Sequence, residues 1–224
     1  MPTFAQILIT LVMNQRGHFI AFEGIDGSGK STQVKLLTQY LTSKGHKVYA
    51  TFEPTDSPIG KIIRDIFNHR MEGDQKVIAA LFAADRLNHL LHSEDGMIKK
   101  LNDGFTVITD RYYLSSYAYH SVHVDMDWVI QLNAQSATLL KPDLNIYIEM
   151  DPQISMNRLN AGRTNIEMYE TLDNLVKVRD QYEIAMELVK NEEKIVKIDG
   201  NRNPEIIAAE IQQLLETKEN EVLY

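Results

Sequence analysis

The sequence predicts an α/β fold in which helices cover both faces of a five-stranded parallel sheet. Three observations lead to this prediction. Short apolar runs alternate with longer helix-like stretches along the chain, which is the order that parallel strands and crossover helices require. The chain has 224 residues and is 44% apolar, which is enough to bury a sizeable core. No repeat, low-complexity tract or long linker divides it.

Strands are expected at five short apolar runs. Their ranges are His18–Glu23, Lys47–Phe52, Phe105–Thr109, Leu144–Met150 and Lys194–Ile198. Helices are expected at Lys30–Lys44, Ile59–Phe67, Gln75–His92, Asp127–Leu140 and Pro204–Leu215. Gly45 is suited to end the first helix, and Pro142 stops the fourth. We therefore expect one domain over residues 17–218.

Two segments are expected to lie outside this compact part. Residues 1–16 are predicted to be a loose N-terminal extension, with Met1 and Met13 as alternative starting residues. Their apolar run, Ile7–Met13, is too short to span a membrane, and it has neither the basic flank nor the cleavage site of a signal peptide. A polar, glycine-containing stretch at about 158–170 carries Arg163 and is predicted to form a mobile flap.

Composition excludes several classes of function. Lys and Arg number 23 against 31 Asp and Glu, a net charge of −8 with no long basic run, which argues against a partner that is a nucleic acid. The chain has no cysteine, so disulfides, zinc thiolates and cysteine nucleophiles are excluded. A cytoplasmic protein without a membrane partner is expected.

The strongest local motif runs from Gly24 to Ser31 and matches the P-loop pattern between a predicted strand and a predicted helix. Its glycines allow a tight turn that directs backbone N–H groups at phosphate oxygens. Lys30 is expected to reach the β- and γ-phosphates of ATP, and the Ser31 hydroxyl to bind Mg²⁺. The residues predicted to bind ATP are Gly24, Ile25, Asp26, Gly27, Ser28, Gly29, Lys30, Ser31 and Thr32.

A second motif, Asp110-Arg111, stands at the end of a predicted strand, where ligands of parallel sheets gather. Asp110 is expected to hold Mg²⁺ and Arg111 a phosphate, although a surface ion pair is the alternative. Arg64, Arg86 and Arg163 lead toward the same edge, yet each alone is also compatible with a solvated arginine.

Phe82 and Arg86 lie four residues apart and share one face of their helix. They are expected to stack on a nucleotide base and to bind its edge. The alternative for Phe82 is a place in the core.

Together these motifs resemble the thymidylate kinase family from about Gly17 to the C-terminus. The similar segments are Phe22–Gln33, Glu53-Pro54 with Ile59-Gly60 and Arg64, Leu81–Arg86, Asp110–Tyr112, Ser115–Tyr119, Lys141–Asp143, Gly162-Arg163 with Glu167–Glu170, and Asp199-Gly200. The resemblance implies transfer of a phosphoryl group from ATP to dTMP with Mg²⁺, for the synthesis of dTTP. It also implies a homodimer.

The resemblance further implies roles for single residues. Lys30, Arg111 and Arg163 would be catalytic. Because Gly27 and Ser28 of the P-loop supply no positive charge, Arg163 would supply it from the flap, with help from Arg158. Asp26 would contact the sugar, and Tyr119 would lie at its 2′ position. Phe82, Arg86 and Ser116 would contact the base. Arg64 and Arg111 would hold the acceptor phosphate, and Glu53 and Pro54 would shape the wall of the phosphate site. The adenine would lie near Asp199–Asn203.

Three segments depart from the common bacterial pattern of that family. Thr55-Asp56 replaces a Gly-Gly pair after Glu53-Pro54, with Phe52 in place of arginine, and Met168 replaces another arginine. His120 replaces a glutamine expected at the base edge, so strict selectivity for thymine is in question, and the alternative is that His120 faces solvent. The rival functions are a P-loop kinase for another deoxynucleoside monophosphate or a deoxynucleoside, and a non-catalytic nucleotide-binding regulator.

Overall fold

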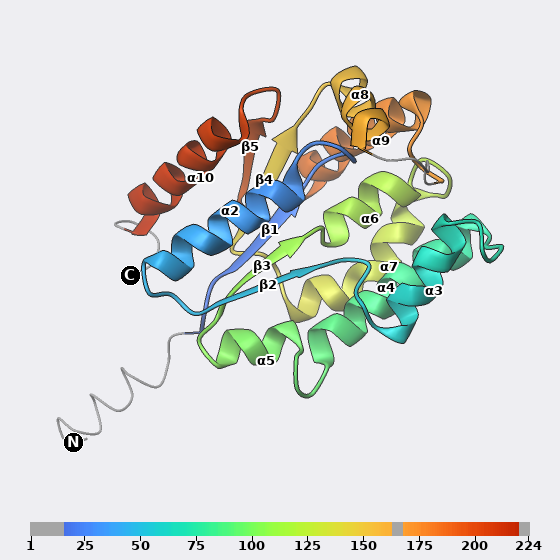
Figure 1. Cartoon of the computed structure of the whole chain (residues 1–224). Helices are drawn as coiled ribbons and strands as arrows, with labels where there is room; N and C mark the ends of the chain where they lie inside the picture. The colour runs from blue at the N-terminus through green and yellow to red at the C-terminus, as the bar shows by residue number, and fades with distance from the viewer. Residues whose placement is uncertain (1–15, 163–167, 220–224) are drawn as a thin grey trace.

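The computed structural model describes residues 16–162 and 168–219, which form a parallel sheet covered by helices (Figure 1). The sheet has the strand order β2-β3-β1-β4-β5. The strands are β1 (Phe19–Glu23), β2 (Val48–Phe52), β3 (Thr106–Asp110), β4 (Leu144–Glu149) and β5 (Ile195–Asp199). All the neighbouring pairs are parallel, so the carboxyl ends of the strands share one edge.

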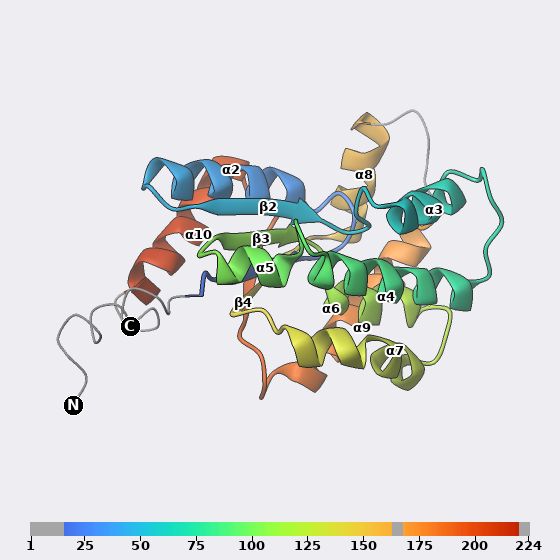
Figure 2. The same cartoon turned by 90° about the horizontal axis from the view of Figure 1, so that it is seen from below.

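Helices lie on both faces of the sheet (Figure 2). They are α2 (Lys30–Ser43), α3 (Pro58–Phe67), α4 (Gln75–Leu91), α5 (Met97–Asn102), α6 (Tyr113–His120), α7 (Met126–Leu139), α8 (Pro152–Gly162), α9 (Leu172–Val189) and α10 (Pro204–Glu219). α2 and α10 cover one face, and α5, α6, α7 and α9 cover the other. The predicted fold class is confirmed.

The central strand β1 shows why both faces need a cover. Its five residues are all buried and alternate in direction. Ile20 and Phe22 pack in the cluster under α2 and α10. Phe19 and Ala21 pack in the larger cluster that includes residues of α6 and α9. A strand buried on both faces is almost continuously apolar, which is the pattern the sequence displays here.

The carboxyl edge of the sheet positions the site. Phe22 lies opposite Asp110, and Asp110 lies opposite Phe52, so the ends of β1, β3 and β2 are level. The chain leaves β1 through the glycine-rich loop and enters α2 at Lys30. β1 lies between β3 and β4, at the point where the strand order of the sheet reverses direction. Open α/β sheets bind ligands at the carboxyl ends of the strands at such a point.

The structure agrees with all five predicted strands and five predicted helices to within a few residues, but four helices of the described residues were not predicted. α6 was missed because all eight of its residues are buried, so it has no polar face to reveal a helical period. The signal for α9 was available in the sequence, since Leu175, Val178 and Tyr182 recur at helical spacing and are buried. α5 and α8 were also missed.

The two segments predicted to lie outside the compact part fall mostly beyond the described residues. The predicted N-terminal extension is described only at Arg16, whose Nη1 lies 3.5 Å from Asp143 Oδ1. α8 extends to Gly162, so the first part of the predicted flap is helical, and Arg163 lies outside the described residues. Among residues 16–162 and 168–219, no helix is both long and apolar enough to cross a membrane.

Candidate active site

A cavity of about 740 Å³ opens along the glycine-rich loop at the carboxyl edge of the sheet. Asp26 and the loop residues from Gly27 to Thr32 line one side, and Asp110 and Arg111 line another. Arg158 and Arg202 also border it. Of the predicted ATP ligands, Ile25 has its side chain in the core instead, 1% exposed, and the Gly24 carbonyl accepts a hydrogen bond from Arg111 Nη1 at 3.2 Å.

The loop has the backbone that anion binding requires. Gly27 and Gly29 have φ values of 74° and 99°, in the left-handed region that side chains rarely adopt. A Cβ atom on Gly27 would lie 2.8 Å from the Ser155 carbonyl oxygen, so the approach of α8 also excludes a side chain there. α2 begins at Lys30 directly after the loop, and the N–H groups of its first turn form a ready site for an anion.

Lys30 is buried at the floor of this cavity, and its Nζ donates to the Ile25 carbonyl at 2.9 Å. Burial lowers the pKa of Lys30 to about 8, with a further contribution from the Arg111 guanidinium. Phosphate oxygens would favour the charged ammonium, because an opposite charge nearby stabilises it. Lys30 is therefore held ready to contact a triphosphate.

Ser31 and Asp110 form the pair predicted to hold a magnesium ion. The Ser31 hydroxyl donates to Asp110 Oδ2 at 2.5 Å across the gap between α2 and β3. Asp110 Oδ1 is buried and has no hydrogen-bond partner among the described residues. These are hard oxygen donors, and an uncommitted carboxylate oxygen is an observation that fits Mg²⁺. No cluster of three or more acidic or histidine side chains that could hold a metal ion occurs in the described part of the chain.

A second cavity of about 230 Å³ adjoins the first. Four residues line both cavities: Asp26, Phe52, Glu53 and Arg111. The smaller cavity brings together the predicted substrate-binding residues, namely Asp26, Glu53, Pro54, Arg64, Phe82, Arg86, Arg111, Ser116, Tyr119 and His120. The structure therefore gathers these residues around one cavity, and their contacts with a substrate stay predictions.

Arg111 lies where the two cavities meet. Its Nη2 lies 2.5 Å from Asp26 Oδ1 and donates to the Tyr119 hydroxyl at 3.0 Å, while that hydroxyl donates to Asp26 Oδ2 at 2.8 Å. Burial alone would raise the pKa of Asp26, but Arg111, Lys30 and Tyr119 outweigh it and lower the pKa. The alternative of a surface ion pair between Asp110 and Arg111 is wrong, because Arg111 pairs with Asp26.

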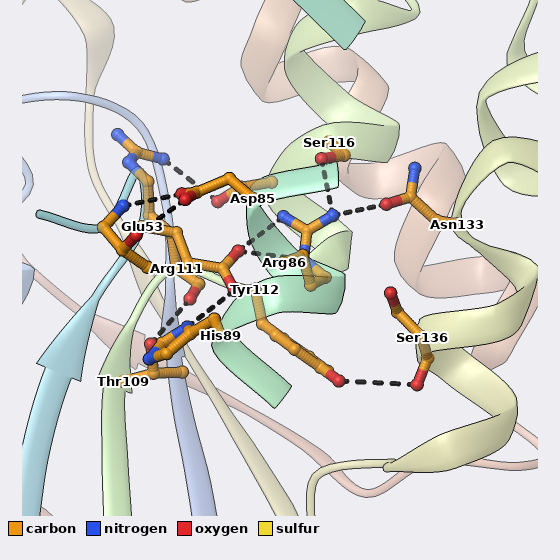
Figure 3. A network of polar contacts seen from close by, with 12 residues as sticks. Glu53, Asp85, Arg86, His89, Thr109, Arg111, Tyr112, Ser116, Asn133 and Ser136 are labelled. Atoms are coloured by element: carbon orange, nitrogen blue, oxygen red, sulfur yellow. Dashed lines mark hydrogen bonds and ion pairs between the residues drawn. The ribbon is translucent and has the colours of Figure 1, made fainter. Parts of the chain in front are cut away.

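Arg86 is fully buried in a polar network under the smaller cavity (Figure 3). Its Nε and Nη2 lie 2.8 and 2.6 Å from Glu53 Oε2. Its Nη1 donates to Ser116 Oγ at 3.0 Å and to Asn133 Oδ1. Four of the five guanidinium N–H groups therefore face protein acceptors, which leaves one on Nη2 for a ligand. The expectation of a solvated arginine is wrong here.

Phe82 and His120 form the apolar wall of the smaller cavity. Their ring centroids lie 5.0 Å apart, and both side chains are buried. The alternative that His120 faces solvent is wrong, since it is 2% exposed. Burial, with a contribution from Arg86, lowers the pKa of His120 to about 3, so the ring is neutral at physiological pH. Within the described part of the chain, His120 Nδ1 has no hydrogen-bond partner.

Arg64 is held by the loop that follows β2. Its Nη1 donates to the carbonyl oxygens of Pro54 and Thr55 at 2.9 and 2.6 Å. Asp85 fixes that loop, because its carboxylate accepts bonds from the Thr55 amide and hydroxyl at 2.7 and 2.6 Å. The Asp56 carboxylate lies 3.4 Å from Arg64 Nη2, so it partly neutralises the positive charge of Arg64.

Several residues of the site were missed in the sequence: Glu23, Asp85, His89, Asn133 and Tyr182. Asp85 is adjacent to Arg86 in the sequence, and Glu23 ends the strand before the P-loop. Their places next to predicted site residues could therefore have indicated that they belong to the site. His89 contacts Thr51 and Glu53. Asn133 and Tyr182 come from α7 and α9, and nothing in their local sequence connects them with the site.

We expect Glu53→Ala to destabilise the fold by about 3–5 kcal/mol, since it leaves the buried Arg86 charge without its carboxylate. Urea denaturation followed by circular dichroism measures this change. Asp103→Ala is the matched control, because it removes an exposed carboxylate paired with Lys99 and should change the free energy of unfolding little. Equal small effects for the two variants would contradict the role of the buried pair.

Comparisons with known proteins show the family of the chain. The family model described as thymidylate kinase matches residues 22–211. A probable thymidylate kinase of Pyrococcus horikoshii is 40% identical over 173 residues, which cover 75% of this chain and 82% of that protein.

Two further relatives match over longer ranges. A probable thymidylate kinase of Thermococcus kodakarensis is 36% identical over 209 residues, 89% of this chain and 97% of the relative. A thymidylate kinase of Caldicellulosiruptor saccharolyticus is 35% identical over 207 residues, 90% of this chain and 97% of the relative. The P-loop, the paired cavities and these similarities lead to one conclusion: the chain belongs to the thymidylate kinase family.

Proposed function

We propose that this protein transfers the γ-phosphoryl group of ATP to dTMP, which yields dTDP and ADP. The observation that carries this proposal is the junction of the two cavities at Asp26, Phe52, Glu53 and Arg111. One cavity has the P-loop of a triphosphate site, and the other has arginines beside an aromatic wall. Two nucleotides in these cavities would meet with their phosphates at the junction, as direct transfer requires.

ATP would occupy the larger cavity. The loop amides and Lys30 would contact its β- and γ-phosphates. Ser31 and Asp110 would hold Mg²⁺, which would supply positive charge to neutralise the phosphates. Arg158 borders this cavity and donates to the Gly200 carbonyl at 3.3 Å, beside the segment Asp199–Asn203 near which the adenine would lie, so helping Arg163 would require it to give up this bond.

The nucleotide dTMP would occupy the smaller cavity. Phe82 would stack on thymine, while Ser116 would keep Arg86 oriented so that its remaining N–H contacts the base edge. The Tyr119 ring, fixed by its bond to Asp26, would crowd the 2′ position and favour deoxyribose. Arg64 and Arg111 would hold the acceptor phosphate against the wall formed by Glu53 and Pro54.

Direct transfer needs no covalent intermediate on this chain. The acceptor phosphate is already an anion, so catalysis consists of positioning and charge neutralisation. Closure of the flap at about 158–170 would exclude water that would otherwise hydrolyse ATP. Arg163 would supply the charge that Gly27 and Ser28 lack.

A second candidate function is phosphorylation of another deoxynucleoside monophosphate or of a deoxynucleoside. The observation that keeps this candidate is the neutral His120 ring beside Phe82, whose Nδ1 has no hydrogen-bond partner among the described residues. Nδ1 donates in one tautomer and accepts in the other, so the base that it favours depends on the tautomer. We also propose that the protein is a homodimer, which the resemblance to the family supports. A cytoplasmic location is proposed because the chain has no cysteine. Light scattering after size exclusion tests the dimer.

A substrate panel tests the proposed function. ADP formation is measured with ATP, Mg²⁺ and one acceptor at a time: dTMP, dUMP, dGMP, dCMP, UMP or thymidine. We expect the highest kcat/KM for dTMP. A preference for any acceptor other than dTMP or dUMP would contradict the proposal, and binding of ATP without turnover of any acceptor would favour a regulator.

We expect Lys30→Ala to abolish transfer while the protein stays folded, because the ammonium would contact phosphate oxygens and its removal leaves no buried charge unpaired, although the bond to the Ile25 carbonyl is lost. Turnover is measured by ADP formation, and the fold by circular dichroism. Lys35→Ala, at an exposed position of the same helix, is the control and should retain full activity. Substantial turnover in Lys30→Ala would remove the assigned role.

We expect Arg163→Ala to lower kcat far more than it raises the KM for dTMP, because its contact would form mainly in the transition state. A loss of about 10²–10³-fold is the usual scale for one such donor. Steady-state kinetics with both substrates varied measure the split. An unchanged kcat would exclude the role of Arg163.

A further inference from the structure

Glu23 is a fully buried carboxylate behind the junction of the two cavities, at the end of β1. One oxygen, Oε1, accepts the Tyr112 backbone N–H at 2.9 Å. The other, Oε2, accepts the Ser115 hydroxyl at 2.5 Å and lies 3.0 Å from the Tyr182 hydroxyl, whose one proton also has Ser115 Oγ within reach at 2.7 Å. The functions assigned above make no use of this group, although burying a carboxylate is costly unless its oxygens are satisfied.

The two hydroxyls that donate to Glu23 also accept from Arg111. Arg111 Nη1 donates to Ser115 Oγ at 3.1 Å and to the Tyr182 hydroxyl at 3.4 Å. A hydroxyl that donates to a carboxylate presents its lone pairs elsewhere, here toward the guanidinium. Glu23 thereby fixes the direction of both hydroxyls, and the hydroxyls fix one edge of Arg111. Asp26 holds the other edge.

Glu23 also holds the backbone that carries Arg111. Arg111 has a φ of 76°, an uncommon value for a residue with a long side chain. The bond from Tyr112 N–H to Glu23, together with the bond from Arg111 N–H to the Phe22 carbonyl at 2.9 Å, fastens this turn to the end of β1. Backbone and side chain of Arg111 are therefore both tied to the same carboxylate.

We propose that Glu23 is a positioning residue that holds Arg111, through Ser115, Tyr182 and the Tyr112 amide, in the direction required to bind the acceptor phosphate. The inference rests on the proposed function, in which Arg111 contacts the phosphate of dTMP. Glu23 itself touches neither nucleotide. It determines how well the guanidinium is oriented before the acceptor arrives, and preorganised donors bind anions more tightly than mobile ones.

The ionisation of Glu23 gives this role a measurable signature. Burial raises the pKa of Glu23 to about 7, although Ser115, Arg111, Tyr182 and Tyr112 each lower it. Above pH 7 both oxygens of the carboxylate can accept, from the Tyr112 N–H and from the neighbouring hydroxyls. Below pH 7 one oxygen carries a proton, so the carboxyl group has one acceptor fewer for these donors. The titratable and charged groups around it are Arg111 and Tyr112 in the turn, Tyr182 on α9, Tyr147 on β4, and Lys30 and Asp26 at the P-loop.

The test is Glu23→Gln, which keeps the volume but replaces one acceptor by an NH₂ donor. If the NH₂ group faces the Tyr112 N–H, two donors meet; if it faces the hydroxyls, they accept from it and must turn their protons elsewhere, so in either case the groups that hold Arg111 rearrange. Calorimetry at pH 8 should show dTMP binding weakened about tenfold, the scale of one hydrogen bond to a charged group. ATP binding should change less than about twofold, since the loop amides and Lys30 stay in place. Unchanged dTMP binding would overturn the proposal.

Tyr182→Phe and Tyr113→Phe provide a matched pair if Glu23→Gln does not fold. Both remove a buried hydroxyl bonded to a carboxylate, but Tyr113 bonds Glu193 at 2.5 Å, away from Arg111. We expect Tyr182→Phe to weaken dTMP binding by a few fold and Tyr113→Phe to leave it unchanged. Equal effects of the two variants would overturn the proposal, because they would reflect general loss of packing.

The pH dependence separates positioning from a structural role. The ratio of the dTMP dissociation constants of Glu23→Gln and wild type should approach one at pH 5.5 and rise to about tenfold above pH 8. The second ionisation of the phosphate, near pH 6, is common to both proteins and cancels in the ratio. A ratio that is flat with pH would overturn the proposal. Failure of the wild type to bind dTMP would instead contradict the proposed function.

Discussion

The ion pair between Arg111 and Asp26 is the constraint on which the site depends. Its two atoms lie 2.5 Å apart at the place where both cavities meet. Asp26 belongs to the P-loop, and Arg111 to the turn after β3, so the pair connects a triphosphate-binding segment with the arginine of the neighbouring cavity. The parallel sheet makes this possible because it brings the ends of β1 and β3 level. Moving either element would separate the two halves of the site.

Buried charges around this pair are held by polar partners rather than by solvent. Arg86 faces Glu53, Ser116 and Asn133, and Glu23 faces two hydroxyls and an amide. Such networks are costly when one member is lost, because the remaining charge stays buried. Their value for a phosphotransferase is a set of donors that are oriented before the ligands arrive, so that little reorganisation is needed during transfer.

The sequence predicted the parts of the fold and the site whose signals are local. The strands, the P-loop and Asp110 were found because apolar runs and fixed spacings mark them within a few residues. α6 was missed since a helix buried on all sides has no polar period. The network around Glu23 was missed because its partner Tyr182 is 159 residues away in the chain, and only the packing of α9 brings it near. The bonds from Arg86 to Glu53 and Asn133 likewise depend on tertiary contacts between α4, the loop after β2, and α7.

The central claim is that a donor and an acceptor nucleotide bind at the same time with their phosphates side by side at the junction of the cavities. A single molecule that joins adenosine to thymidine through a chain of phosphates tests this claim most directly, because it would fill both cavities. The account predicts inhibition that is competitive with ATP and also competitive with dTMP in steady-state kinetics. Competition with one substrate alone would show that the two cavities do not form one continuous site, and would contradict the account.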